Sequence, residues 1–247
     1  MTATLAHIWR HPIKAHGVEP LDTVTLTAGK ALPYDRAWAI QHEGTRMQGA
    51  DWAPCANFSR GAKAPQLMAV RCKLDERTEQ MTLTHPNRPD LVAHPDRDGP
   101  AIIDWVQPLM PADRARSTAV IRASTQAFTD SPFPSISIGN LATHRAVEAQ
   151  LGQELALERW RANLWLDGLE PWEEFNWIGK TLHIGGAVLE VKERITRCLA
   201  TTANPATGLR DADTLGALDH WSHRDFGIYA TVTTSGDIAT GDKAQLQ

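Results

Sequence analysis

Arg194-Ile-Thr-Arg-Cys-Leu-Ala-Thr-Thr-Ala-Asn-Pro-Ala-Thr-Gly208 is the stretch around which the rest of the sequence is organised, and Cys198 lies near its centre. An apolar run that alternates between Leu182 and Val191 leads into it. Asn204-Pro205 leads out of it, and both residue types favour turns. The pattern predicts a long strand that delivers Cys198 to the mouth of a loop.

Cys198 has three basic neighbours within six residues, namely Lys192, Arg194 and Arg197. Positive charge beside a thiol favours the thiolate, which attacks electrophiles and binds soft metals. A free cysteine is also commonly a small buried hydrophobe without chemistry. On these residues alone both interpretations stay open.

Composition narrows the class of protein. The chain has 247 residues, of which 42% are hydrophobic and 22% charged, and a net charge of -4. Such a balance argues against a general nucleic-acid or membrane-surface binder. Three widely spaced cysteines without a C-x-x-C pair predict neither a disulfide framework nor a zinc or iron–sulfur site. No signal peptide or transmembrane run is recognised, so we expect a cytoplasmic protein.

Strands outnumber helices in the pattern, which predicts a mainly β fold with attached helices, of the α+β class and containing β-barrels. A polar, basic stretch before residue 124 predicts two domains, 1–124 and 125–247. Helices are expected over 100–110 and between Asn140 as N-cap and Gly152 as C-terminal stop. Strands are expected at 3–10, 21–27, 34–42, 66–74, 80–84, 136–138, 159–166, from 181 onwards and at 226–234.

Four cations stand near turn residues or proline: Lys14, Arg36, Arg161 and Arg197. Arginine reads phosphate as a planar fork, and lysine serves as a point charge. The common hydrolase, metalloprotease and nucleotide-binding motifs are absent from the sequence. Four cations and one cysteine with basic neighbours would together suit an anionic cofactor that carries a metal.

Five motifs in order then carry a resemblance. Arg197–Gly208 resembles the cysteine motif of the molybdenum-cofactor sulfurase C-terminal (MOSC) domain, and Arg159-Trp-Arg-Ala-Asn-Leu164 resembles its Arg-Phe-Arg-Pro-Asn motif. Phe226-Gly-Ile-Tyr is similar to the start of its C-terminal strand pair. His11-Pro-Ile-Lys14 and Tyr34-Asp-Arg-Ala-Trp38 resemble motifs of the barrel domain that precedes it. The resemblance covers nearly the whole chain and implies a MOSC β-barrel packed against an N-terminal β-barrel-like domain.

The resemblance also implies a site. Cys198 would ligate molybdenum beside the dithiolene of molybdopterin, and Asp130 is a candidate proton relay. Alternation in 159–166 independently predicts one strand face for Arg161 and Asn163. Ala15 and Ala162 depart from the family pattern, which often has serine and proline there. The implied cofactor contacts are Lys14, Arg36, Ser131, Arg161, Asn163, Thr196 and Arg197.

The implied activity is that of the mitochondrial amidoxime reducing component family: two-electron reduction of small N-hydroxylated compounds, or of N- and S-oxides, by a molybdenum oxidoreductase. The electrons would come from a separate partner of the ferredoxin, flavin reductase or cytochrome b5 type. One alternative is sulfur transfer through a Cys198 persulfide, although the family's sulfurases carry an aminotransferase-like domain, with pyridoxal phosphate, that we do not expect here. Another is a molybdopterin-binding protein without enzymatic activity.

Overall fold

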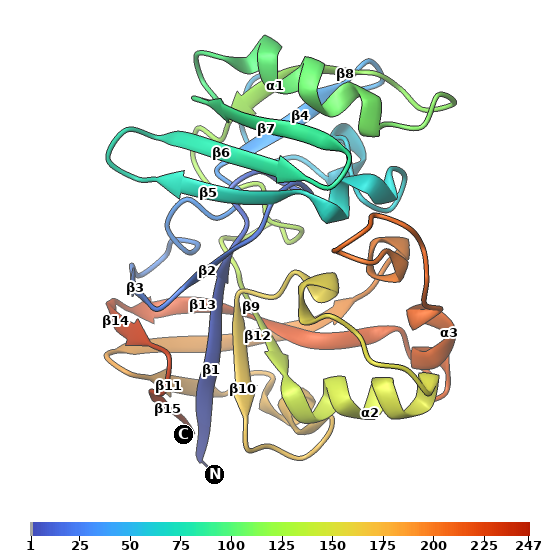
Figure 1. Ribbon diagram of the computed structural model, residues 1–247. Coiled ribbons are helices and arrows are strands. Elements are labelled where there is room, and N and C mark those ends of the chain that lie inside the picture. Colours follow the sequence, from blue (N-terminus) through green and yellow to red (C-terminus); the bar gives the residue numbers. More distant parts are fainter. Residues whose placement is uncertain (1) are drawn as a thin grey trace.

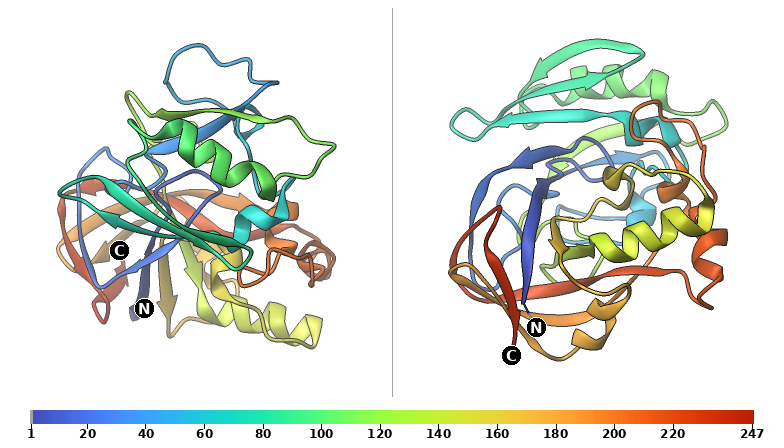
Figure 2. Two further views of the ribbon diagram at one scale, coloured as in Figure 1. Left: turned by 45° about the horizontal axis from the view of Figure 1, so that its top comes forward. Right: turned by 60° about the horizontal axis from the view of Figure 1, so that its bottom comes forward.

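The largest sheet closes into a barrel around one apolar interior. A computed structural model describes residues 2–247. The strands follow the order β10-β9-β13-β12-β11-β15-β1, and β1 pairs again with β10 to complete the ring (Figures 1 and 2). The strands of the ring are β1 Thr2–Arg10, β9 Ile136–Asn140, β10 Leu164–Asp167, β11 Thr181–Ile184, β12 Ala187–Thr196, β13 Asp225–Thr234 and β15 Lys243–Leu246. The mainly β fold with attached helices, which the sequence predicted, is thereby confirmed.

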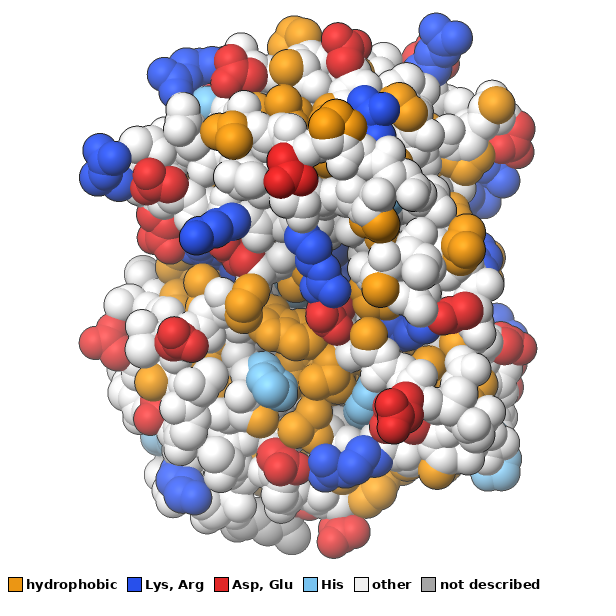
Figure 3. All heavy atoms as spheres, in the orientation of Figure 1, with side chains coloured by type: hydrophobic (Ala, Val, Ile, Leu, Met, Phe, Trp, Pro, Cys, Tyr) orange, Lys and Arg blue, Asp and Glu red, His pale blue; other side chains and the backbone are white. Residues whose placement is uncertain are grey.

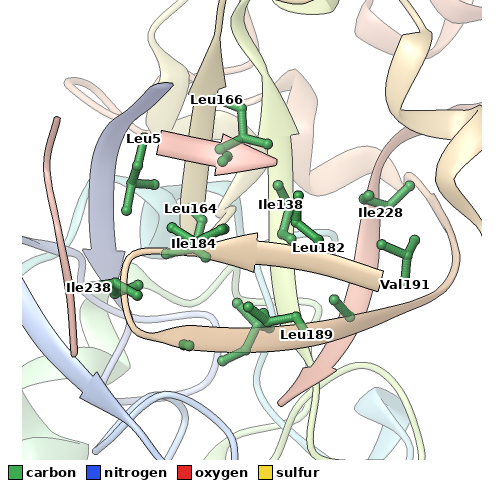
Figure 4. Close-up of a cluster of buried hydrophobic side chains, with 14 of the residues drawn as sticks. Leu5, Ile138, Leu164, Leu166, Leu182, Ile184, Leu189, Val191, Ile228 and Ile238 are labelled. Atoms are coloured by element: carbon green, nitrogen blue, oxygen red, sulfur yellow. The ribbon is translucent and has the colours of Figure 1, made fainter. Parts of the chain in front are cut away.

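Alternating side chains fill the barrel. In β12, Ala187, Leu189 and Val191 are buried, and the residues between them are partly exposed. Successive side chains of a strand point to opposite faces, so this pattern directs one apolar face inwards. Figure 4 shows Leu189 and Val191 of β12 in this core together with Leu182 of β11 and Ile138 of β9. Burial of each leucine or isoleucine contributes about 1.5–3 kcal/mol, which makes the barrel a firm platform for the loops at its rim.

A second layer lies above the barrel in Figure 1 and has its own apolar core. It consists of a three-stranded sheet, a two-stranded pair and a helix. Trp38, Leu83, Ile102 and Trp105 are among its buried residues. The strands and helix are β4 Trp38–His42, β5 Arg71–Asp75, β6 Gln80–His85, β7 Arg88–Ala93, α1 Gly99–Val106 and β8 Ser117–Arg122.

The N-terminal segment of the chain belongs to both layers. β1 comes from the first residues yet pairs with β10 and β15, so the two ends of the chain lie side by side. β2 Glu19–Leu21 extends the barrel sheet from β1, and β3 Thr23–Leu26 pairs with β14 Gly236–Ala239. The predicted boundary at residue 124 stays a prediction, but the N-terminal segment contributes strands to both layers.

Two helices flank the barrel. α2 Leu141–Leu151 begins and ends as the sequence predicts, because the Asn140 side chain accepts a hydrogen bond from the amide of Ala142 and Gly152 takes the left-handed conformation. α3 Thr214–Asp219 packs beside it. In the part of the chain that the structure describes, no helix combines the length and apolarity needed to cross a membrane.

Three expected strands start later than the alternation indicates. The 3₁₀ segment Pro65–Ala69 delays β5 to Arg71. Arg36 has φ 51°, so the strand predicted over 34–42 begins only at Trp38. Arg161 has φ 50° and ends the 3₁₀ turn Leu157–Trp160, so β10 begins only at Leu164. The shared strand face predicted for Arg161 and Asn163 is therefore wrong.

Candidate functional site

The cavity of interest, of about 260 Å³, is lined by residues of both layers. Its walls come from the Lys14 turn and the 55–68 segment of the upper layer, and from the end of β12 and the middle of β13 below. On the face shown in Figure 3, lysine and arginine side chains gather along the seam between the layers. The seam is where segments far apart in sequence meet, so no single motif can define the site.

Cys198 directly follows β12, as the sequence predicts. Its side chain is exposed and lines the cavity. Its carbonyl accepts hydrogen bonds from the amide (3.2 Å) and hydroxyl (3.1 Å) of Thr201, which fix the turn Leu199–Thr202. Gly208 closes the loop with φ 71°, and a Cβ there would lie 2.6 Å from the Cα of Gln66. The thiol is thus held on a rigid loop that packs against the upper layer.

Lys14 and Asp130 form an ion pair within the cavity. Lys14 Nζ donates to the Asp130 carboxylate at 2.5 Å and to the Phe128 carbonyl at 2.8 Å, and its side chain is nearly buried. The Asp130 side chain keeps 54% of its surface exposed. Desolvation works against its charge, but Lys14 and Arg36 outweigh it and hold the pKa of Asp130 at about 2. Asp130 is therefore ionised at neutral pH, where it would accept a proton rather than donate one.

Arg36 is held in place by an ion pair with the buried carboxylate of Asp35. Its guanidinium donates to Asp35 and, at 2.9 Å, to the Arg161 carbonyl. Burial would raise the pKa of Asp35, but Arg36 and the hydrogen bonds from His11 hold it below its ordinary value. Burial and Arg161 lower the pKa of His11 to about 3, so this imidazole is neutral. Arg36 is consequently locked in one orientation before any ligand binds.

Arg161 and Arg197 are anchored by backbone carbonyls rather than by carboxylates. Arg161 Nη1 donates to Gly17 at 3.2 Å, and its buried Nη2 has no hydrogen-bond partner among residues 2–247. Arg197 donates to the carbonyls of Trp160 and Phe226. Burial lowers the pKa of Arg161 to about 9, with Arg36 adding to the effect, and that of Arg197 to about 10. Both remain charged at neutral pH.

We call Lys14, Arg36, Arg161 and Arg197 the cationic cluster. Its four positive charges face two carboxylates, Asp35 and Asp130, which leaves an excess of two positive charges. A partly enclosed site of low dielectric makes such an excess costly unless an anion shares the space. The cluster has the charge, and in Arg161 the free donor, for a phosphate group.

The other three predicted cofactor contacts, Thr196, Ser131 and Asn163, differ in whether they line the cavity. Thr196 lines the cavity, and its hydroxyl donates to Asp225 at 2.7 Å. The structure does not bring Ser131 into the cavity wall, because its hydroxyl turns inwards to Ser135 (2.7 Å) and the Phe133 carbonyl (2.9 Å). Asn163 lines only a small adjoining recess.

The side chain of Asn163 is held by hydrogen bonds to two strands. Its Oδ1 accepts from the amide and hydroxyl of Ser137, and its Nδ2 donates to the Trp9 carbonyl at 3.1 Å. These bonds join β1, β9 and the start of β10. Asn163 therefore fixes the wall of the recess that adjoins the cavity.

The sequence reasoning missed several lining residues. Ser137 and Tyr229 face the cavity from β9 and β13, where they pair across the strands. Burial and Asp130 raise the pKa of Tyr229, which keeps the phenol protonated. The upper layer adds Cys55, Arg60 and Met68. Tyr229 is the last residue of the Phe226-Gly-Ile-Tyr motif, which is the sequence signal that could have found it, whereas no such motif marks the others.

We call Cys55, Arg60, Met68 and Cys198 the thiol cluster. Arg60 Nη1 lies 3.0 Å from Cys55 Sγ. A Cβ on Gly61 would lie 2.5 Å from Met68 Sδ and 3.5 Å from the Cβ of Ala200, two residues after Cys198. The segment that carries Arg60 therefore packs against the loop that carries Cys198.

Comparisons with known proteins agree with this arrangement. The family model described as "MOSC N-terminal beta barrel domain" matches residues 2–110, and the one described as "MOSC domain" matches residues 127–245. A molybdenum cofactor sulfurase of Caenorhabditis briggsae is 31% identical over 138 residues. The match covers 53% of this chain and 19% of the sulfurase, so the chain spans about a fifth of that relative.

Two solved structures are among those that align with the chain. The YUAD protein from Bacillus subtilis is 14% identical with a TM-score of 0.46, and the alignment covers 100% of this chain and 96% of that one. YiiM from Geobacillus stearothermophilus is 18% identical with a TM-score of 0.35, over 45% of this chain and 53% of that one.

Proposed function

The chain belongs to the MOSC-domain family, and from that premise we propose that its cavity binds the molybdenum cofactor and reduces N-hydroxylated compounds, or N- and S-oxides. One observation carries the proposal above all. An exposed cysteine lies in the same cavity as four cations that face only two carboxylates. A phosphorylated group that carries a soft metal would use both features.

The residues present fit this cofactor. Arg161 Nη2 is a buried donor without a partner among residues 2–247, which a phosphate oxygen would satisfy. Lys14 and Arg36 would bind the same phosphate as point charge and planar fork. Cys198 offers a soft sulfur ligand on a rigid loop.

The chain's own groups have distinct tasks in the proposed reaction. When bound, the molybdenum would supply the two-electron chemistry that removes oxygen from the substrate. Arg197, held by two backbone carbonyls, keeps the loop entrance positive beside Cys198. Asp130, ionised and paired with Lys14, would hold a proton only transiently. The electrons would come from a separate electron-transfer protein.

The test is to produce the protein in cells that make the molybdenum cofactor. We expect bound molybdenum, which Cys198→Ala loses, and reduction of benzamidoxime to benzamidine with a reduced dye as donor. Because Cys198 is exposed, the variant should fold normally, and its unfolding curve provides the control. Molybdenum binding without turnover of any N-oxygenated compound would favour a binding protein over a reductase.

Sulfur transfer is the second candidate, and the exposure of Cys198 favours it, because a persulfide there would be accessible to an acceptor. The relative from Caenorhabditis briggsae carries the name of a sulfurase, although the match covers a small part of it. Cyanide-labile sulfur on Cys198 in protein without molybdenum would support this candidate and contradict the reductase.

A further inference from the structure

Arg60 differs from the other arginines of the cavity in how its charge is matched. Arg36 is paired with Asp35, and Arg159 is paired with Asp211 at 2.6 Å. Arg161 and Arg197 donate to backbone carbonyls. Within residues 2–247, the Arg60 guanidinium makes no ion pair, and its hydrogen bond goes to the sulfur of Cys55. A thiol is a weak acceptor and carries little of the charge of a guanidinium.

The position of Arg60 is fixed by the backbone around it. The Ser59 amide donates to the Ile40 carbonyl at 2.8 Å, and the Arg60 carbonyl accepts from the amides of Lys63 and Ala64 at 3.0 Å each. Arg210 donates to the Ala62 carbonyl at 2.9 Å and also contacts the Leu199 carbonyl. These bonds tie the Arg60 turn to the Cys198 loop, so a molecule bound at Cys198 has Arg60 as a neighbour.

A partly buried guanidinium that is not paired with a carboxylate offers several hydrogen-bond donors and a positive charge to an anion in the cavity. Lys14 of the cationic cluster pairs with Asp130, whereas Arg60 contacts Cys55, and Gly61 beside it packs close to Ala200 of the Cys198 loop. The two groups therefore serve different parts of a bound assembly. Building on the proposed function, we infer that Arg60 is a specificity-determining residue that binds an anionic group of the substrate, so that the preferred substrates are N-oxygenated compounds with a carboxylate.

The experiment compares benzamidoxime with 4-carboxybenzamidoxime on the cofactor-loaded protein. Arg60→Gln removes the charge, Arg60→Lys keeps it, and Arg145→Gln makes the same change on an exposed ion pair of α2 as the matched control. We expect Arg60→Gln to lower kcat/KM for the carboxylate compound about 10- to 100-fold, mainly through KM, as loss of a charge-assisted hydrogen bond predicts. The neutral compound should change less than about twofold.

Two further results keep the inference separate from the proposed function. If neither compound is reduced by the wild type, the proposed function fails, and calorimetric binding of the two compounds still tests Arg60. A carboxylate compound that binds wild type no more tightly than the neutral one overturns the inference. Loss of molybdenum from Arg60→Gln also overturns it, because Arg60 would then serve the cofactor. Rescue of the preference in Arg60→Lys would support it.

Discussion

The cationic cluster and the thiol cluster line one cavity but are built in opposite ways. In the cationic cluster every charged side chain is held by a carboxylate or a backbone carbonyl, and Arg161 Nη2 is a buried nitrogen without a partner within residues 2–247. In the thiol cluster Cys198 is exposed, and the hydrogen bond that Arg60 makes within the described residues goes to the sulfur of Cys55. The contrast indicates one half whose cations are fixed before any ligand binds, and a second half in which Arg60 keeps donor capacity for a ligand.

The largest expected effect comes from breaking the support of the cationic cluster. Arg36→Met leaves the fully buried Asp35 carboxylate without its cation, so we expect a loss of about 3–5 kcal/mol in the free energy of unfolding of the cofactor-free protein. Urea denaturation measures it. The double variant Asp35→Asn/Arg36→Met is the control and should recover most of the loss. An unchanged stability in Arg36→Met would show that the pair does not organise this half.

Arg161 should behave differently, because it forms no ion pair with a carboxylate in the part of the chain that the structure describes. Arg161→Gln should leave the free energy of unfolding within about 1 kcal/mol of wild type but weaken binding of inorganic phosphate about 10-fold or more. Calorimetric titration of the cofactor-free protein measures the affinity. Equal phosphate affinity in the variant would remove Arg161 from the anion site.

The family resemblance implies Ser131 as a cofactor contact, whereas the structure places it outside the cavity wall. Ser131→Ala removes its hydrogen bonds to Ser135 and Phe133, so we expect a loss of about 1 kcal/mol in stability and unchanged molybdenum content. Thermal unfolding and metal analysis of the same preparation provide both readouts. Loss of molybdenum at unchanged stability would return Ser131 to the cofactor contacts.

The smallest expected effect concerns Asp130 and pH. Its pKa is lowered from 3.8 to about 2, so its contribution to stability is present above about pH 4 and is lost as the pH falls through about 2. Asp130→Asn should flatten this acid limb of the stability profile. At neutral pH it removes one negative charge beside Lys14, and phosphate affinity should rise a few fold. Weaker phosphate binding in the variant would contradict this electrostatic account.

The sequence pattern predicted those features of the fold that depend on residues close together in the chain. The alternation that ends in β12, the position of Cys198 after it, and the caps Asn140 and Gly152 all depend on neighbours within a few residues. Thr196, Arg197 and Lys14 also line the cavity as the resemblance implies. These features were accessible without coordinates because strand period and helix capping are properties of short segments.

The remainder depends on distant contacts. Arg36 has a positive φ, and its backbone amide donates a hydrogen bond to the His11 carbonyl. Arg161 also has a positive φ, and its carbonyl accepts a hydrogen bond from the Arg36 side chain. Local preference disfavours this conformation for arginine, so alternation extended both strands too far. Likewise β1 enters the barrel only through pairing with β10 and β15. Arg60 follows no motif and reaches the cavity only because its turn packs on the Cys198 loop.

X-ray absorption at the molybdenum edge tests most directly whether Cys198 and the cationic cluster together hold one molybdenum cofactor. Protein from cofactor-competent cells should hold about one molybdenum per chain with a shell of sulfur ligands. Cys198→Ser, at the same exposed position, should lose the metal or lose one sulfur from that shell. A variant that keeps all its molybdenum with an unchanged sulfur shell would contradict the account.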